Sequence, residues 1–146
     1  MPQEETALME KQTQFPLSFA QERLWFLHKL EPELSVYSIP MQMRLTGPLD
    51  MQALAWSLSE LENRQEMLRT RFEEVEGQPV QIIAAGAPRR IPLVDLSNLA
   101  SGEQRPAVGE LVAREEEGLF DLGAGRLMRV TVLKLNEQES WLLKTL

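Results

Sequence analysis

Few side chains in this sequence have the chemistry needed for proton transfer or metal binding. The 146 residues include one histidine, His28, and no cysteine. The lack of cysteine excludes a thiolate nucleophile, a disulfide framework and thiolate ligands for zinc within these residues. A Ser-His-Asp arrangement or a His-rich metal site would have to be built around His28 alone, and no motif of either kind surrounds it. We therefore expect no metal site here.

A run of three glutamates, Glu115-Glu116-Glu117, is the other group that invites a chemical interpretation. Carboxylates held together could bind a metal ion or take part in acid–base catalysis. The run falls within a predicted helix, residues 103–118, and adjacent residues of a helix point in different directions. We therefore interpret these glutamates as a solvent-exposed face of the helix.

Composition and charge limit the classes of function. The length falls in the range of one domain, and 43% hydrophobic and 25% charged residues are typical of a soluble globular protein. A formal net charge of −7, without a basic block, argues against nucleic acid and anionic membranes as partners. No apolar run is long enough to cross a bilayer, and the first residues are acidic, unlike a signal peptide. We expect a cytoplasmic protein.

The elements that would position a site begin with a helix at residues 18–30. Ser18 is expected to cap its first turn, and Gln21 to complete a capping box. Leucines recur at helical spacing, with Trp25 beside them, until Pro32 ends the helix. Arg23 lies next to this apolar face, where it is either buried or a surface residue whose stem covers apolar neighbours.

Alternating and β-branched segments predict strands at residues 36–46, 69–75, 80–83, 91–94, 127–135 and 140–146. Pro40 indicates an edge position or a bulge near the start of the first of these. A further helix is expected at residues 50–61, capped by Asp50. The segment 127–135 carries the strongest strand pattern.

Three segments resemble, in order and spacing, the motifs of condensation domains of nonribosomal peptide synthetases. Residues 18–27 resemble the opening motif, through Ser18-x-Ala20-Gln21-x-Arg23-Leu24-Trp25-x-Leu27. Residues 64–72, Arg-Gln-Glu-Met-Leu-Arg-Thr-Arg-Phe, resemble the family's Arg-His-Glu-x-Leu-Arg-Thr-x-Phe. Residues 120–129, Phe-Asp-Leu-Gly-Ala-Gly-Arg-Leu-Met-Arg, resemble a third motif. Gln65 and Arg126 depart from the histidine and the proline that the family usually has there.

The resemblance implies an α+β fold, a mixed sheet packed with helices, resembling one lobe of the chloramphenicol-acetyltransferase-like fold. Residues 15–146 would form the N-terminal part of a condensation domain, incomplete, and residues 1–14 a leader or docking tail. In the family, a strand like residues 141–146 runs into His-His-x-x-x-Asp-Gly, which carries the catalytic histidine. We therefore expect no catalytic residue in this chain and no activity from it alone.

The resemblance also assigns supporting roles. Arg69 would pair with the aspartate of that histidine motif, Arg64 and Glu66 would belong to the same supporting shell, and Arg23 would brace the site from the helix. Tyr37 falls where the family has a Tyr-Asn-x-Pro segment near the substrate channel, although Ser38 replaces the asparagine. The motif residues with an expected structural role are Ser18, Gln21, Trp25 and Thr70.

For the parent enzyme, the resemblance implies amide formation between an acyl or peptidyl donor and an aminoacyl acceptor, both carried by carrier proteins as phosphopantetheine thioesters. No cofactor would bind this chain directly. Expected partners are carrier proteins, the remaining condensation lobe and an upstream synthetase that residues 1–14 could recognise. Two alternatives stay open: a docking half of a split condensation domain, and a starter-type acyltransferase that adds a fatty acyl group. Uncovered apolar faces also predict self-association.

Overall fold

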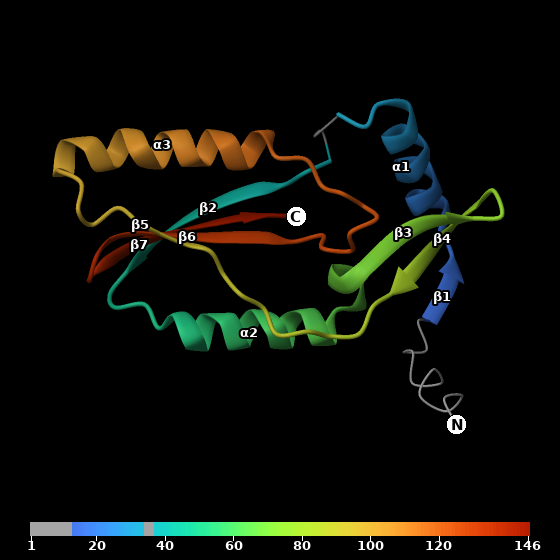
Figure 1. Ribbon diagram of the computed structural model, residues 1–146, viewed down its shortest axis with the longest axis horizontal. Coiled ribbons are helices and arrows are strands. Elements are labelled where there is room, and N and C mark those ends of the chain that lie inside the picture. Colours follow the sequence, from blue (N-terminus) through green and yellow to red (C-terminus); the bar gives the residue numbers. More distant parts are fainter. Residues whose placement is uncertain (1–12, 34–36) are drawn as a thin grey trace, which may run out of the picture.

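The computed structural model describes residues 13–33 and 37–146, which form two β-sheets and the helices that cover them (Figure 1). The larger sheet has the strand order β2-β7-β6-β5 and is mixed, since only β5 runs parallel to its neighbour. The smaller, antiparallel sheet has the order β1-β4-β3. The strands are β1 (Thr13–Pro16), β2 (Pro40–Thr46), β3 (Thr70–Val75), β4 (Gln78–Ile83), β5 (Leu93–Asp95), β6 (Arg129–Asn136) and β7 (Glu139–Thr145).

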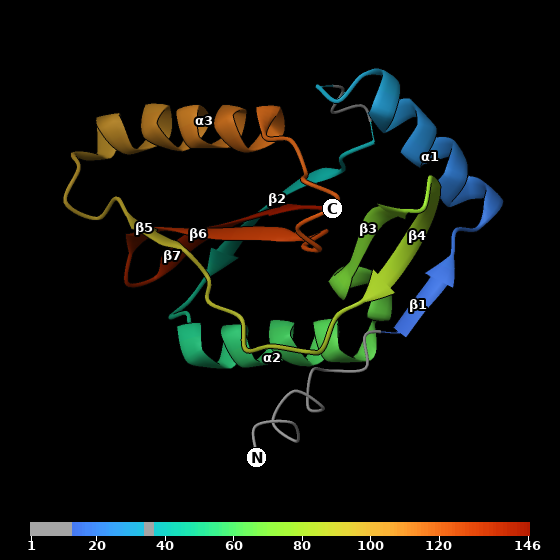
Figure 2. The same cartoon turned by 45° about the vertical axis from the view of Figure 1, so that its right-hand side comes forward.

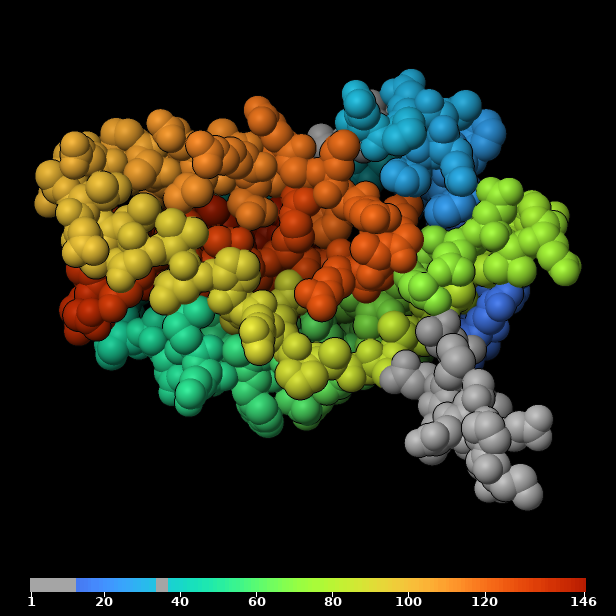
Figure 3. All heavy atoms as spheres, in the orientation of Figure 1, coloured from blue at the N-terminus to red at the C-terminus, as the bar shows by residue number. Residues whose placement is uncertain are grey.

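Two helices enclose the larger sheet and a third lies on the smaller one. α3 (Ser101–Glu117) covers one face of the larger sheet and α2 (Met51–Arg64) covers the other, as Figures 1 and 2 both show. In the space-filling view, the atoms of α2 and α3 lie on either side of the red strands (Figure 3). α1 (Phe19–Leu30) packs against the β3–β4 hairpin, and a short 3-10 helix (Glu66–Arg69) precedes β3.

The central strand β6 supplies both halves of the core. Successive side chains of a strand point to opposite faces, and the adjacent residues Val132 and Leu133 are both 0% exposed. Leu133 packs with Leu143 and Val108 on the side of α3, whereas Val132 packs with Leu142 on the side of α2. The segment with the strongest strand pattern is thus buried on both faces.

The predicted cap of the first helix is confirmed. Ser18 Oγ accepts the backbone N–H of Gln21 at 3.3 Å, and Gln21 Oε1 accepts the N–H of Ser18 at 2.8 Å. These bonds satisfy donors at the helix start that have no partner within the helix. The cap fixes where α1 begins relative to β1, which enters directly before it.

Replacing Ser18 with alanine is expected to lower the free energy of unfolding by about 0.5–2 kcal/mol, the usual cost of losing an N-cap side chain. Urea unfolding followed by circular dichroism measures this. Ser57 is the matched control, because its hydroxyl donates within a helix interior, to the carbonyl of Ala53. An equal loss in Ser18→Ala and Ser57→Ala would contradict a special role for the cap.

The structure settles one alternative and changes several details of the sequence-based interpretation. Of the two positions left open for Arg23, buried or on the surface, the structure shows the surface one, and no residue of α1 is fully buried. The strand predicted from residue 36 starts at Pro40, on the edge of the sheet as expected, while residues 34–36 lie outside the described residues. The glutamate run is not uniformly solvated, because Glu115 is half-buried and accepts a hydrogen bond from Thr131.

Candidate functional site

A cavity of about 260 Å³ lies where α1, β3 and residues 119–127 meet the last residue, Leu146. Its wall is mainly apolar, with Trp25 and Leu27 from α1 and Phe72 from β3. Tyr37, whose role as a substrate-channel residue stays a prediction, forms part of the rim. The size and the apolar lining suit one small organic group.

Contacts between side chains hold α1 against the hairpin below the cavity. The rings of Trp25 and Phe72 are 6.5 Å apart and tilted by 40°, a favourable arrangement for two aromatic rings. Gln21, which already caps the helix, donates through Nε2 to Gln81 Oε1 at 3.1 Å. Gln21 and Trp25 of the first motif therefore link the helix to the smaller sheet and also line the cavity.

The opposite wall, residues 119–127, is attached at two points. The backbone N–H of Phe72 donates to the carbonyl of Leu122 at 2.9 Å, which joins the segment to β3. Arg129 of β6 donates to the carbonyls of Leu119 at 2.8 Å, Gly118 at 2.8 Å and Glu115 at 3.0 Å. These carbonyls lie at and beyond the end of α3, where helix carbonyls lack intrahelical partners. Arg129 thus caps the C-terminal end of α3 and holds the first residues of the cavity wall in place.

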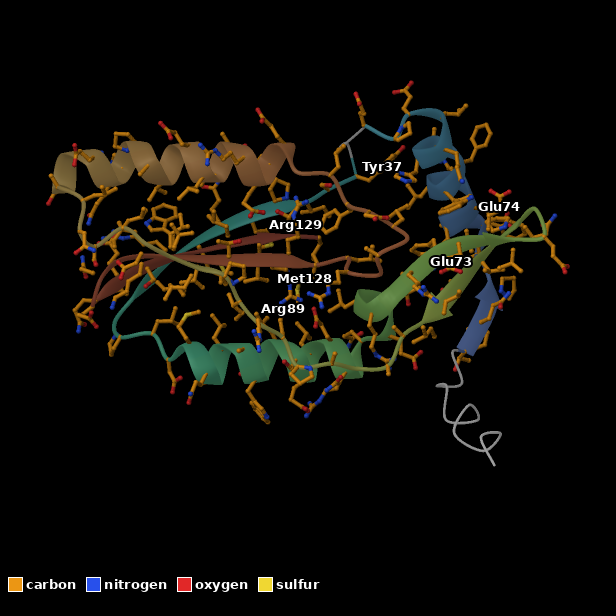
Figure 4. The ribbon with its side chains drawn as sticks, in the orientation of Figure 1. Tyr37, Glu73, Glu74, Arg89, Met128 and Arg129 are labelled. Atoms are coloured by element: carbon orange, nitrogen blue, oxygen red, sulfur yellow. The ribbon has the colours of Figure 1, made fainter. Side chains whose placement is uncertain are left out.

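Arg129 also stacks on an aromatic ring of the wall. Its guanidinium lies 4.5 Å from the ring centre of Phe120, which lines the cavity, and forms an ion pair with Glu115 at 3.5 Å. Figure 4 shows Arg129 on the side of the larger sheet that faces α3. This single side chain therefore couples α3, β6 and the cavity wall.

Replacing Arg129 with methionine is expected to lower the free energy of unfolding by about 1.5–3 kcal/mol, the range for hydrogen bonds that involve a charged group. It should also speed proteolysis within residues 118–121, because their carbonyls lose the guanidinium. Urea unfolding and limited proteolysis measure the two effects. Arg114→Met, at an exposed position in the last turn of the same helix, should change neither the free energy of unfolding nor the rate of proteolysis. Equal changes in the two variants would argue against a special role for the hydrogen bonds from Arg129 to the carbonyls.

The second motif forms a separate cluster at the start of β3. Arg69 donates to the carbonyl of Ala84 and forms an ion pair with Glu66 at 3.7 Å. Its Nε atom is buried and has no hydrogen-bond partner among the described residues. Thr70 is buried and donates through Oγ1 to the carbonyl of Glu66 at 2.8 Å, which fixes the turn that presents Arg69.

The predicted supporting residues, Arg23, Arg64, Glu66 and Arg69, do not all lie close together in the structure. The side chain of Arg64 is 76% exposed and pairs with Glu60 at 3.7 Å on the outside of α2. Arg23 is exposed on α1. Glu66 accompanies Arg69, so of the supporting set only these two residues meet. The roles taken from the resemblance stay predictions.

Sequence reasoning missed two features. One is the cavity wall formed by the third motif together with the residue before it, since Leu119, Phe120 and Leu127 line the cavity. The available signal was the concentration of large apolar residues in a segment that also contains turn residues. The other is Arg89, which forms an ion pair with Glu62 of α2 and donates to the carbonyl of Met128. Figure 4 shows Arg89 and Met128 between the larger sheet and α2. Burial, and secondarily the charge of Arg126, hold the pKa of Arg89 below its usual value.

Comparison with known proteins decides the family. A model of the condensation domain matches residues 11–146. The chain belongs to the condensation domain family. It is 40% identical to a linear gramicidin synthase of Brevibacillus parabrevis over 90% of this chain, and 37% identical to the phosphinothricin tripeptide synthetase PhsC of Streptomyces viridochromogenes over 89%. The matches span 2% and 12% of those proteins, respectively.

Solved condensation domains share the fold. The starter condensation domain of rhizomide synthetase RzmA superposes with a TM-score of 0.80 at 22% identity, over 91% of this chain and 33% of that one. The first condensation domain of the CDA synthetase gives 0.74 at 20% identity, over 92% and 35%. The prediction of an α+β fold of the chloramphenicol-acetyltransferase type is confirmed, and the chain corresponds to about a third of such a domain.

Two exclusions hold for the described part of this condensation domain chain. Residues 13–33 and 37–146 contain no group of three or more histidine, cysteine or acidic side chains placed to hold a metal ion. Among the helices in those ranges, none has both the length and the apolar character required to span a bilayer. The predicted docking tail, residues 1–14, lies almost entirely outside the described residues.

Proposed function

We propose that this chain contributes the N-terminal part of a condensation domain that joins a carrier-bound acyl or peptidyl donor to a carrier-bound aminoacyl acceptor. In that reaction the acceptor amine attacks the donor thioester, a C–N bond forms, and the C–S bond breaks to release the carrier thiol. Family membership supports the reaction class. The observation that carries the role of this chain is the buried Nε atom of Arg69, which lacks a partner among the described residues.

The chemistry of Arg69 explains why it supports a site and does not act as a base. A guanidinium stays protonated at any physiological pH and cannot accept the proton of the amine. Its planar fork suits a carboxylate, and such a partner would stabilise this guanidinium, whose side chain is only 22% exposed. Glu66 lies 3.7 Å away with an exposed side chain, so it satisfies Arg69 only in part. We therefore assign to Arg69 the placement of a carboxylate-bearing segment, in the family the one that carries the histidines.

The proton acceptor is expected to come from outside these residues. An imidazole that titrates near neutral pH suits an amine nucleophile. The only histidine, His28, lies in α1 among the residues that line the cavity, beside Trp25 at 6.2 Å between ring centres. It occupies none of the motif positions that the family uses for that purpose. No cofactor is bound by this chain in the proposal, since the phosphopantetheine arms belong to the carrier proteins.

The test compares residues 1–146 alone with the same residues fused to the remainder of a condensation domain. Carrier proteins loaded with donor and acceptor are incubated with each, and mass spectrometry of the carriers detects the amide. The proposal expects product only from the fusion. In the fusion, Arg69→Met should lower turnover strongly, Arg69→Lys less, and Arg64→Met should have little effect. Turnover by residues 1–146 alone, or equal effects at both arginines, would refute it.

The same assay addresses the two alternatives, because the fold is common to all three. Adding the remainder of the domain as a separate polypeptide, in place of a fusion, tests the split-domain interpretation. Offering a fatty acyl donor beside an aminoacyl donor tests the starter-type interpretation. The donor transferred by the active combination identifies the class of reaction.

A further inference from the structure

The side-chain amide of Gln21 joins three separate segments of the chain. Its Oε1 accepts the backbone N–H of Ser18 at 2.8 Å, and its Nε2 donates to Gln81 Oε1 at 3.1 Å and to Met67 Sδ at 3.6 Å. Gln81 lies in β4, whereas Met67 lies in the short 3-10 helix of the second motif, which ends at Arg69. The cap of α1 and the turn that presents Arg69 therefore share one amide group.

Two backbone groups fix the orientation of the amides in this network. A backbone N–H can only donate, so the N–H of Ser18 must face the oxygen of Gln21. The carbonyl of Pro16 can only accept, and it takes a hydrogen bond from Gln81 Nε2 at 2.9 Å, so the oxygen of Gln81 must face Gln21. The NH₂ group of Gln21 is thereby directed at Gln81 and Met67. Turning either amide over would place two donors or two acceptors against each other.

The turn that carries Arg69 is held from two sides. On the side of β4, the carbonyl of Arg69 accepts the N–H of Ala84 at 3.1 Å, and the guanidinium donates to the carbonyl of Ala84. On the side of α1, Met67 accepts the N–H of Gln21 through its sulfur, and its carbonyl accepts the N–H of Thr70. Met67 is 47% exposed, so burial alone does not fix its side chain. The amide of Gln21 supplies a directed contact in its place.

We propose that Gln21 is a positioning residue for the reaction, which acts through Met67 to fix the turn that directs Arg69. The inference rests on the function proposed above and on the role given there to Arg69. A glutamate three residues after the N-cap would complete the capping box as well as glutamine does. Only the amide can both accept from Ser18 and donate to Met67, so the second contact is what distinguishes glutamine from glutamate here.

Gln21→Glu separates the two contacts, because a carboxylate keeps the acceptor for Ser18 and loses both donors. The variant is made in the fusion of residues 1–146 with the remainder of a condensation domain, and turnover of the loaded carrier proteins is measured. We expect kcat to fall about two- to tenfold, the effect of one hydrogen bond, with KM for the carrier proteins little changed. Gln52→Glu adds the same charge at an exposed position in the first turn of α2 and should leave turnover unchanged.

A double-mutant cycle with Arg69 distinguishes positioning from general destabilisation. Once Arg69→Met has removed the guanidinium, Gln21→Glu should have no further effect on kcat. A loss of stability, or a change in the cavity that Gln21 also lines, would lower kcat by the same factor in both backgrounds. Hydrogen–deuterium exchange of the fused domain gives a second readout. Gln21→Glu should speed exchange of the N–H of Thr70, which bonds to the carbonyl of Met67.

Reversing the polarity of the contact should restore it. Met67→Lys places an ammonium donor opposite the carboxylate introduced by Gln21→Glu, at a position that is exposed enough to accept a charge. The two substitutions together should bring kcat to within about twofold of the unsubstituted fusion and slow the exchange at Thr70 again. Met67→Lys alone should lower kcat, because the ammonium and the NH₂ group of Gln21 are both donors.

The outcomes separate this inference from the proposed function. A fall in kcat with Gln21→Glu that disappears in the Arg69→Met background and is recovered by Met67→Lys supports it. An unchanged kcat, or the same fall in both backgrounds, overturns it while Arg69→Met alone still lowers turnover. Absence of product from the fusion, or no effect of Arg69→Met, means that the proposed function fails. Unchanged exchange at Thr70 would then overturn this inference as well, and circular dichroism shows whether each variant folds.

Discussion

Replacing Glu62 with alanine is expected to lower the free energy of unfolding by about 3–5 kcal/mol, because Arg89 would be left buried without its carboxylate. The two side chains are only 11% and 17% exposed, and they join the segment before β5 to α2. Arg89 also donates to the carbonyl of Met128, which is itself buried, so the unpaired charge cannot turn toward water without breaking that bond. Urea unfolding followed by fluorescence measures the change.

The same helix supplies a control pair. Glu60 and Arg64 lie one helical turn apart, at 3.7 Å, and their side chains are 39% and 76% exposed, far more than those of the buried pair. Removing an exposed partner of this kind usually costs less than about 1 kcal/mol, so Glu60→Ala should be nearly neutral. Replacing both members of the buried pair, Glu62→Leu with Arg89→Met, should recover much of the lost stability. Equal losses in Glu62→Ala and Glu60→Ala would contradict the role given to burial.

Replacing Leu133 with alanine is expected to lower the free energy of unfolding by about 2–5 kcal/mol, the range for a leucine lost from a close-packed core. Leu133 is 0% exposed in the central strand β6, between neighbours on both sides and beneath α3. The surrounding elements cannot collapse fully into the space, because β6 is held by hydrogen bonds to β5 and β7. Thermal and urea unfolding of the variant measure the loss.

Leu30 is the matched control for the core. It is 62% exposed at the end of α1, so Leu30→Ala removes the same atoms from an environment that water already reaches. Alanine also has the highest helix propensity. The expected change is within about 0.5 kcal/mol. A loss at Leu30 as large as that at Leu133 would mean that α1 packs against something in solution that covers its outer face.

Local physical rules account for the parts of the structure that the sequence predicted. The Ser18–Gln21 cap involves residues three apart, and the strand β6 was predicted from a local run of β-branched and long apolar residues, so neither prediction required knowledge of distant contacts. The family motifs were recognised for the same reason, since each occupies ten residues or fewer. The edge position of Pro40 followed from its missing N–H.

Long-range packing accounts for the parts that the sequence could not predict. Arg23 and Arg89 are both arginines near apolar neighbours, yet Arg23 is exposed and Arg89 is buried. The difference arises because α2 places Glu62 next to Arg89, although the two residues are 27 positions apart in the sequence. Among the described contacts, no carboxylate pairs with Arg23 on the outer face of α1. Glu115 likewise differs from the solvent-exposed glutamates next to it, because Thr131 and Arg129 of β6 contact its carboxylate.

The sequence by itself determined the family, the motif residues and the order of the elements other than β1, because these depend on short spacings and residue types. Only the tertiary structure decided that the first and third motifs enclose one cavity and that Arg69 has a buried Nε without a partner among the described residues. The physical reason is that burial and pairing are properties of surfaces that meet, and those surfaces come from segments far apart in the chain.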